Sequence, residues 1–148
     1  MAEPDAELAG AATRALLPIE ALRVAYLFGS RARGTARADS DLDIAVIYAD
    51  DAGPEQRETL RRRVVAALTD ALGSVGERAD VVDLERAPAE IAFAAIHATR
   101  LIARTDAERV RHEVRIARRY DDEAPRRALF RAAAKRVAEE MGRTDGRS

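Results

Sequence analysis

Residues 22–50 read LRVAYLFGSRARGTARADSDLDIAVIYAD, and this stretch decides the fold of the chain. An apolar run from Val24 to Phe28 ends at Gly29-Ser30, and a second apolar run extends from Ile44 to Tyr48. Short runs of aliphatic and aromatic residues bounded by Gly and polar residues are typical of buried strands. The stretch therefore predicts two strands joined by a polar loop.

Two carboxylates lie where the second strand begins, in Asp41-Leu42-Asp43. Side chains alternate along a strand, so Asp41 and Asp43 point to one face. Two like charges that are neighbours on a sheet face repel unless a cation lies between them. Oxygen ligands without His or Cys nearby favour Mg²⁺ or Mn²⁺. Solvation at a strand entrance is the alternative explanation for the pair.

The Gly29-Ser30 turn is a candidate phosphate-binding site next to the candidate metal site. Gly lets the backbone pass close to a ligand, and a helical turn after it would add N-terminal amides for an anion. The Ser30 hydroxyl can donate a hydrogen bond to a phosphate, and Arg31 or Arg33 can add positive charge. Because the turn and the carboxylates lie within 15 residues, one loop can present a polyphosphate to metal ions.

A third carboxylate would complete a site for two metal ions. The predicted strand 80–84 offers Asp80 and Asp83, which alternation puts on opposite faces. Asp80 is preferred, because it begins its strand beside the start of the Asp41 strand if the two strands are parallel neighbours. Asp83 is then a surface residue or a partner for an arginine, and Asp39 is an alternative outer group of the site.

The remaining sequence predicts helices around these strands and one further short strand. The expected elements are helices over 6–17 (capped by Asp5), 55–72, about 88–98, from 106 and from 125, and a strand over 101–103. The predicted fold class is α/β (α+β), a small mixed sheet flanked by helices. We expect one domain over 1–148, with a core about 20–104, a C-terminal helical hairpin about 106–141 and a frayed tail 142–148.

The bulk composition restricts the class of protein. The chain has 148 residues, enough for one domain, and no cysteine, which excludes disulfides, thiolate metal sites and thiol nucleophiles. No segment approaches the roughly 18 apolar residues that cross a bilayer, and the acidic N-terminus lacks a signal pattern, so a cytoplasmic location is expected.

The charge is unevenly distributed along the chain. The formal net charge of −1 argues against nucleic acid bound by charge alone. Residues 1–103 carry −5 (12 Arg against 17 acids), and residues 104–148 carry +4 (13 Arg and Lys against 9 acids). The basic C-terminal region is either a solvated helix face or a surface for an acidic partner.

The sequence contains a spaced motif: Gly29-Ser30, ten residues, then Asp41-Leu42-Asp43, with an Asp on a later strand. This motif resembles the signature of minimal nucleotidyltransferases of the DNA-polymerase-β-like superfamily. More narrowly, the chain is similar to the minimal nucleotidyltransferase (MNT) antitoxins paired with HEPN-domain toxins. In those antitoxins the segment 80–88 and Arg119-Tyr120-Asp121 also have counterparts. The resemblance covers most of the chain and implies a polymerase-β-like core.

The resemblance also implies an activity. ATP would bind with its β- and γ-phosphates at Gly29 and Ser30, and Asp41, Asp43 and Asp80 would hold two Mg²⁺ ions for transfer of AMP. The acceptor in the antitoxins is a tyrosine hydroxyl of the cognate HEPN ribonuclease, which this modification silences. A hetero-oligomer with that toxin is the implied assembly. Two alternatives stay open: an antitoxin that acts by binding alone, and a transferase for a small molecule or an RNA end.

Three further residues have side chains that can act in catalysis or recognition: His97, His112 and Tyr120. His97 and His112 are expected in surface or packing roles, and neither follows an Arg at the spacing of the HEPN signature, so this chain is not the nuclease. Tyr120 either packs against the core or contacts a partner.

Overall fold

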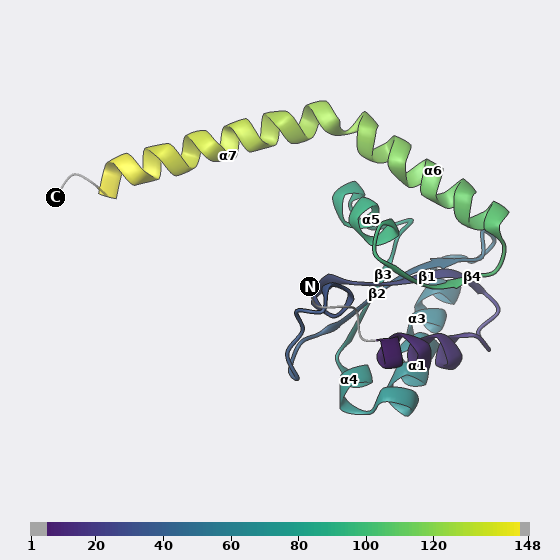
Figure 1. Cartoon of the computed structure of the whole chain (residues 1–148). Helices are drawn as coiled ribbons and strands as arrows, with labels where there is room; N and C mark the ends of the chain where they lie inside the picture. The colour runs from purple at the N-terminus through teal and green to yellow at the C-terminus, as the bar shows by residue number, and fades with distance from the viewer. Residues whose placement is uncertain (1–5, 146–148) are drawn as a thin grey trace.

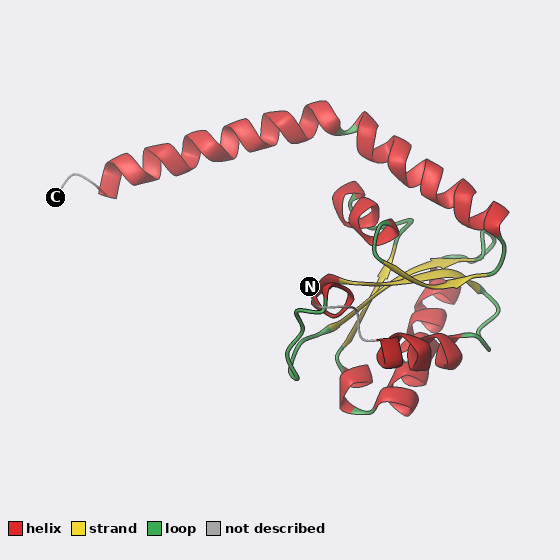
Figure 2. Ribbon diagram, viewed as in Figure 1, coloured by secondary structure: helices red, strands yellow, loops and turns green. Residues whose placement is uncertain are grey.

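The computed structural model describes residues 6–145 and shows a mixed sheet between two layers of helices, with one long helix that extends away from them (Figure 1, Figure 2). In chain order the elements are α1 (Ala6–Leu16), β1 (Leu22–Phe28), α2 (Gly29–Arg33), β2 (Leu42–Tyr48), α3 (Pro54–Leu72), α4 (Ser74–Glu77), β3 (Ala79–Asp83), α5 (Ala89–Ile96), β4 (Thr99–Ala103), α6 (Asp106–Asp122) and α7 (Ala124–Asp145). The predicted fold class, a small mixed sheet flanked by helices, is confirmed.

The two strands predicted from residues 22–50 form the centre of the sheet, whose order is β3-β2-β1-β4. β1 pairs antiparallel with β2 and with β4, whereas β2 pairs parallel with β3. Parallel neighbours need a long crossover connection, and α3 with α4 supplies it. The last residues of β1 and the first residues of β2 and β3 therefore lie at the same end of the sheet.

Each face of the sheet carries its own apolar cluster. Ile44 and Val46 of β2 pack with residues of α1 and α3, while Ala45 and Ile47 pack with residues of α5 and α6. Figure 1 shows these helix pairs on opposite sides of the strands. Burial on both faces explains why the central strands are continuous apolar runs. By the same alternation, the side chain of Asp43 lies on the face of Ala45 and Ile47, which α5 and α6 cover.

The predicted C-terminal helical hairpin is wrong. Both helices are present, but α7 leads away from the core instead of folding back along α6 (Figure 1). One residue, Glu123, separates the two helices, and an antiparallel return requires a loop of about two to five residues. The large apolar side chains of α7 are consequently exposed, namely Leu129, Phe130, Val137 and Met141.

Other differences from the predicted elements are small. β3 begins at Ala79 rather than at residue 80, β4 begins at Thr99, and the short α4 was not predicted. α7 is helical through Asp145, whereas Asp5 and the last residues of the predicted tail lie outside the described residues. Among residues 6–145, no helix combines the length and the apolar content that a membrane span requires.

The close packing of α4 on α3 sets the position of β3, and Gly76 makes it possible. A Cβ at Gly76 would overlap the main chain of Leu68 and Thr69. We expect Gly76→Ala to lower the free energy of unfolding by about 2 kcal/mol, since backbone cannot give way as a flexible side chain can. Urea unfolding followed by circular dichroism measures this difference.

Gly10→Ala is the matched control for that substitution. Its Cβ would meet only the end of the Arg14 side chain, so we expect unchanged or slightly higher stability in this helical position. Equal losses in the two variants would contradict the packing argument.

Candidate active site

Gly29 follows the last residue of β1 and begins α2 at the end of the sheet where β2 starts. Its φ of 73° lies in the left-handed region that favours glycine. A Cβ at this position would also overlap the carboxylate of Asp43, whose backbone pairs with that of Phe28 across β1 and β2. Two separate constraints, the backbone conformation and the approach of Asp43, therefore require glycine here.

Three of the predicted carboxylates come together beside this turn. Asp43 pairs with Asp80 in the parallel register of β2 and β3, so their side chains are neighbours on one face of the sheet. Asp41 precedes β2 by one residue. Burial raises the pKa of Asp43 above its ordinary value, and the charges of Asp80 and Asp41 raise it further, while Arg33 acts in the opposite direction.

This mutual repulsion is what a bound cation would relieve. Within residues 6–145, none of the three carboxylates accepts a hydrogen bond or forms an ion pair, so all of their oxygens are available. An all-oxygen set suits Mg²⁺. The residues present therefore fit divalent cations of this type.

The three carboxylates are more widely spaced than the ligands of a single compact ion site. In the described part of the chain, only a different group, Asp50, Glu85 and His112, has ligand atoms that all lie within 4.8 Å of one another. A spread set of carboxylates is the arrangement expected where two ions lie side by side and share ligands.

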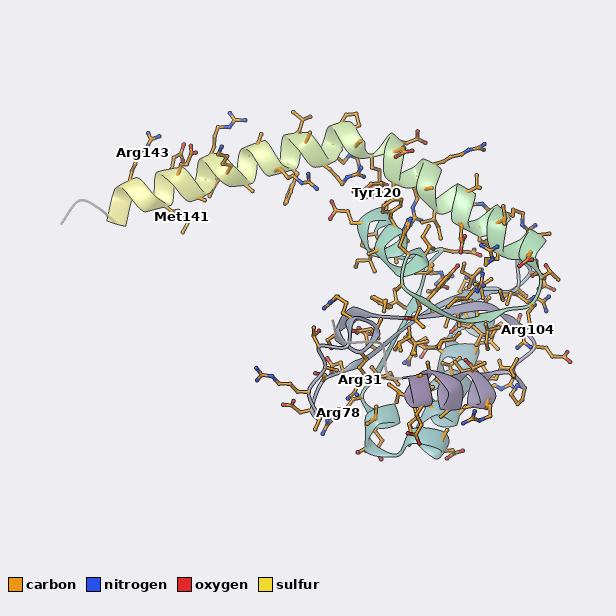
Figure 3. The ribbon with its side chains drawn as sticks, viewed as in Figure 1. Arg31, Arg78, Arg104, Tyr120, Met141 and Arg143 are labelled. Carbon is orange, nitrogen blue, oxygen red and sulfur yellow. The ribbon has the colours of Figure 1, made fainter. Side chains whose placement is uncertain are left out.

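Two arginines hold the loop that carries Asp41, and Figure 3 shows both on the same side of the molecule. Arg31 Nη2 donates to the backbone oxygen of Ser40 at 2.9 Å. Arg78 Nη1 donates to the backbone oxygen of Ala38 at 3.0 Å. Arg31, expected to add charge for a phosphate, thus braces the loop, and no sequence pattern had pointed to Arg78.

The remaining residues of the predicted phosphate turn are open to a ligand. Ser30 lies in the first turn of α2, and its hydroxyl makes no hydrogen bond within residues 6–145. Arg33 is exposed, and its charge reaches Asp43. Asp39 is exposed on the loop. The turn therefore presents a free hydroxyl and one uncommitted guanidinium beside the carboxylates.

The strands and the carboxylate cluster match a known family. Residues 15–108, which contain all four strands and Asp41, Asp43 and Asp80, match the family model described as Polymerase beta, Nucleotidyltransferase. The chain belongs to this nucleotidyltransferase family. The family resemblance inferred from the sequence is thereby confirmed. A search of curated proteins finds no match.

Solved structures similar to this nucleotidyltransferase come from toxin–antitoxin complexes. One, a toxin–antitoxin with AMP-PNP, is 27% identical, with a TM-score of 0.66 over 85% of this chain and 98% of that chain. A mutant MntA–HpeT toxin–antitoxin complex gives 28% identity and a TM-score of 0.62 over 82% and 93% of the two chains. The complex of a tri-AMPylated Shewanella oneidensis HEPN toxin with an MNT antitoxin gives 25% and 0.58 over 86% and 98%. The nucleotidyltransferase therefore resembles MNT antitoxins in structure as well as in sequence motif.

The structure separates the two candidates for the third carboxylate. Asp80 lies beside Asp43, whereas Asp83 accepts a hydrogen bond from Arg57 Nη1 at 2.7 Å. The prediction that Asp83 is a partner for an arginine is confirmed. In this nucleotidyltransferase, Asp80 is the one of the two that lies next to the turn.

Tyr120, His97 and His112 lie outside the carboxylate cluster. The Tyr120 ring stacks on Phe93 with centroids 4.0 Å apart, and the guanidinium of Arg127 lies 3.5 Å from its centroid. Tyr120 thus packs against α5 at the junction of α6 and α7. His97 is exposed, but His112 is buried next to Asp50 and Glu85, an arrangement that no sequence spacing had indicated.

The repulsion within the carboxylate cluster predicts a stability effect. Since the folded state raises the pKa of Asp43, its charged form costs stability at neutral pH, and this cost disappears as the pH falls below the folded pKa. We expect Asp43→Asn to raise Tm by roughly 2–4 °C in EDTA, corresponding to about 1 kcal/mol.

Addition of Mg²⁺ should reverse the order of the Tm values, so that the wild type becomes more stable than Asp43→Asn. Mg²⁺ is expected to raise the Tm of the wild type and to have little effect on the Asp43→Asn variant, as measured by scanning calorimetry. Asp39→Asn, which removes an exposed charge from the neighbouring loop, is the control and should behave as wild type. A lower Tm for Asp43→Asn in EDTA would show that the carboxylate stabilises the fold instead.

Proposed function

We propose that this nucleotidyltransferase is an antitoxin that transfers AMP from ATP to a tyrosine hydroxyl of a cognate HEPN-type toxin. The observation that carries the proposal is the grouping of Asp41, Asp43 and Asp80 beside the Gly29-Ser30 turn. It is supported by the similar structures, one described with AMP-PNP and another with an AMPylated HEPN toxin.

Each part of the site has a role in this proposal. The Gly29-Ser30 turn would bind the β- and γ-phosphates of ATP, with the Ser30 hydroxyl as donor and Arg33 as a nearby cation. Asp41, Asp43 and Asp80 would hold Mg²⁺. When bound, Mg²⁺ would offset the negative charge that accumulates on the phosphates during transfer. Arg31 and Arg78 would keep Asp41 in position by bracing its loop.

The proposed reaction is an in-line displacement. The tyrosine oxygen forms a bond to the α-phosphorus of ATP, the bond from that phosphorus to the bridging oxygen breaks, and pyrophosphate leaves. The hydroxyl proton passes to a carboxylate of the site or to water. Alignment of the acceptor with the α-phosphate supplies much of the rate in such transfers.

The exposed surface of α7 supports a protein as the acceptor. Phe130, Val137 and Met141 share one side of the helix at helical spacing and are 75%, 53% and 64% exposed. The helix also carries six basic residues against three acidic ones. A helix without packing on its apolar side is marginal in water. We therefore propose that the toxin binds this side of α7 and that its docking surface is acidic.

The transfer can be tested with ATP labelled at the α-phosphate and the protein encoded beside this chain. We expect label and a mass increment of AMP on that partner, and loss of both, by a factor of about 10³ or more, in the Asp41→Ala/Asp43→Ala variant. Intact-protein mass spectrometry and survival of cells that express the partner measure the outcome.

The same experiment separates the alternatives. Full neutralisation of the partner by the double variant, without any mass increment, would favour an antitoxin that acts by binding alone. Label that appears on a small molecule or an RNA end, with none on protein, would favour another acceptor.

The docking role of α7 has its own test. We expect Phe130→Glu to weaken binding to the partner at least tenfold in calorimetric titration, because it places a charge in the apolar strip. Ala132→Glu adds the same charge on the opposite side of the helix, so it serves as the matched control and should bind normally. Equal loss in both variants would indicate a general effect of charge, and no loss in either would exclude α7 as the docking surface.

A further inference from the structure

A second cluster of ligand-type side chains lies at the opposite end of the sheet from the carboxylates of the active site. Asp50 follows the end of β2, Glu85 follows the end of β3, and His112 comes from α6. One ligand atom from each lies within 4.8 Å of the other two. The length of β2 separates this cluster from Asp43, a distance of about 20 Å at the rise of an extended strand.

His112 is the buried member of the cluster. Its side chain is only 3% exposed, and its Nε2 lies 3.8 Å from Asp50 Oδ1, which is too long for a hydrogen bond. Within residues 6–145 no closer polar partner of this ring is present. Burial lowers the pKa of His112, and Arg111 and Arg115 lower it further, against the opposing charges of Asp50 and Glu85. Burial thus favours the uncharged ring, which is the form of histidine that binds metal ions.

The two carboxylates are each fixed by an arginine through one oxygen. Arg57 Nη2 donates to Glu85 Oε2 at 3.1 Å, and Glu85 Oε1 is buried without a hydrogen-bond partner in the described residues. Arg111 Nη2 donates to Asp50 Oδ2 at 3.0 Å, which leaves Oδ1 toward the histidine. An orphaned buried carboxylate oxygen costs free energy unless a cation or a donor reaches it.

We propose that His112, Asp50 and Glu85 bind one divalent transition-metal ion of the Zn²⁺ type. A neutral imidazole nitrogen with two carboxylate oxygens is a ligand set that suits Zn²⁺, while Mg²⁺ prefers oxygen alone. Asp50 is 54% exposed on its side chain, so the ion has a route from solvent. Arg57 and Arg111 hold the carboxylates in place and leave one oxygen of each for the ion.

The consequence of such a site would be structural. The ion would connect the ends of β2 and β3 to α6, the helix from which α7 projects (Figure 1). Outside this cluster, Arg23 of β1 bonds to Glu108 of α6 at 2.8 Å and Tyr26 of β1 bonds to Glu113 at 2.7 Å. Arg119 of α6 also donates to the backbone oxygen of Ala87 at 3.0 Å. A metal at His112 would add a further fixed point on α6 and so help to hold the direction in which α7 leaves the core.

The test uses the full chain in an Asp41→Asn/Asp43→Asn background, which weakens the separate oxygen site. After dialysis against EDTA, the protein is given Zn²⁺, passed through a gel-filtration column and analysed for metal. We expect one equivalent of zinc to be retained and the Tm to rise by roughly 5 °C or more at a hundredfold excess over Kd. Co²⁺ in place of Zn²⁺ should give visible ligand-field absorption.

Two variants and one matched control decide the assignment. His112→Gln and Asp50→Asn should each lose the retained zinc and the cobalt absorption; Asp50 is exposed, so its variant keeps the test valid should the buried substitution fail to fold. His97→Gln removes the other histidine of the chain, which is exposed on α5's C-terminal end, and should retain one equivalent. Substoichiometric zinc in the background protein, or equal retention by Asp50→Asn, would overturn the proposal.

Discussion

The close approach between the Asp43 carboxylate and Gly29 is the constraint on which the candidate active site depends. It requires a left-handed glycine at the end of β1, because any Cβ there would occupy the space of the carboxylate. The candidate site depends as well on the strand pairing, because the antiparallel register sets Asp43 opposite Phe28 and the parallel register sets it beside Asp80. The pairing of β1, β2 and β3 therefore sets both the topology of the sheet and the grouping of the carboxylates.

The two ends of this sheet differ in the ligands they offer. At the starts of β2 and β3, the charges of Asp80 and Asp41 raise the pKa of Asp43, and the charge of Arg33 acts in the opposite direction. At the far ends, Asp83 and Glu85 share the guanidinium of Arg57, and the buried His112 lies near oxygens of Glu85 and Asp50. Oxygen ligands alone suit a hard cation with phosphate, whereas the mixed set suits an ion with a structural role. The fold thus separates a cluster of mutually repelling carboxylates from a cluster in which arginines pair with the carboxylates.

The projecting helix α7 is attached to the core at its start. Tyr120, stacked between Phe93 and Arg127, fixes the start of this helix against α5. Beyond that point the large apolar side chains of α7 are exposed and, within residues 6–145, are not covered by the core. Exposed apolar surface of this kind is typical of surfaces that bind a partner. A helix that is fixed at its start and carries an exposed apolar strip supports the proposal that the acceptor is a protein bound by this nucleotidyltransferase.

The sequence by itself determined the central strands, the Gly29-Ser30 turn and the carboxylate pair, because apolar runs and side-chain alternation act over a few neighbouring residues. It also favoured Asp80 over Asp83 on the condition that two strands were parallel, and only the tertiary structure met that condition. The direction of α7 and the meeting of Asp50, Glu85 and His112 were decided by the tertiary structure alone. The meeting of Asp50, Glu85 and His112 depends on the crossover through α3, and the direction of α7 depends on the single residue between α6 and α7. Neither arrangement produces a pattern among neighbouring residues of the sequence.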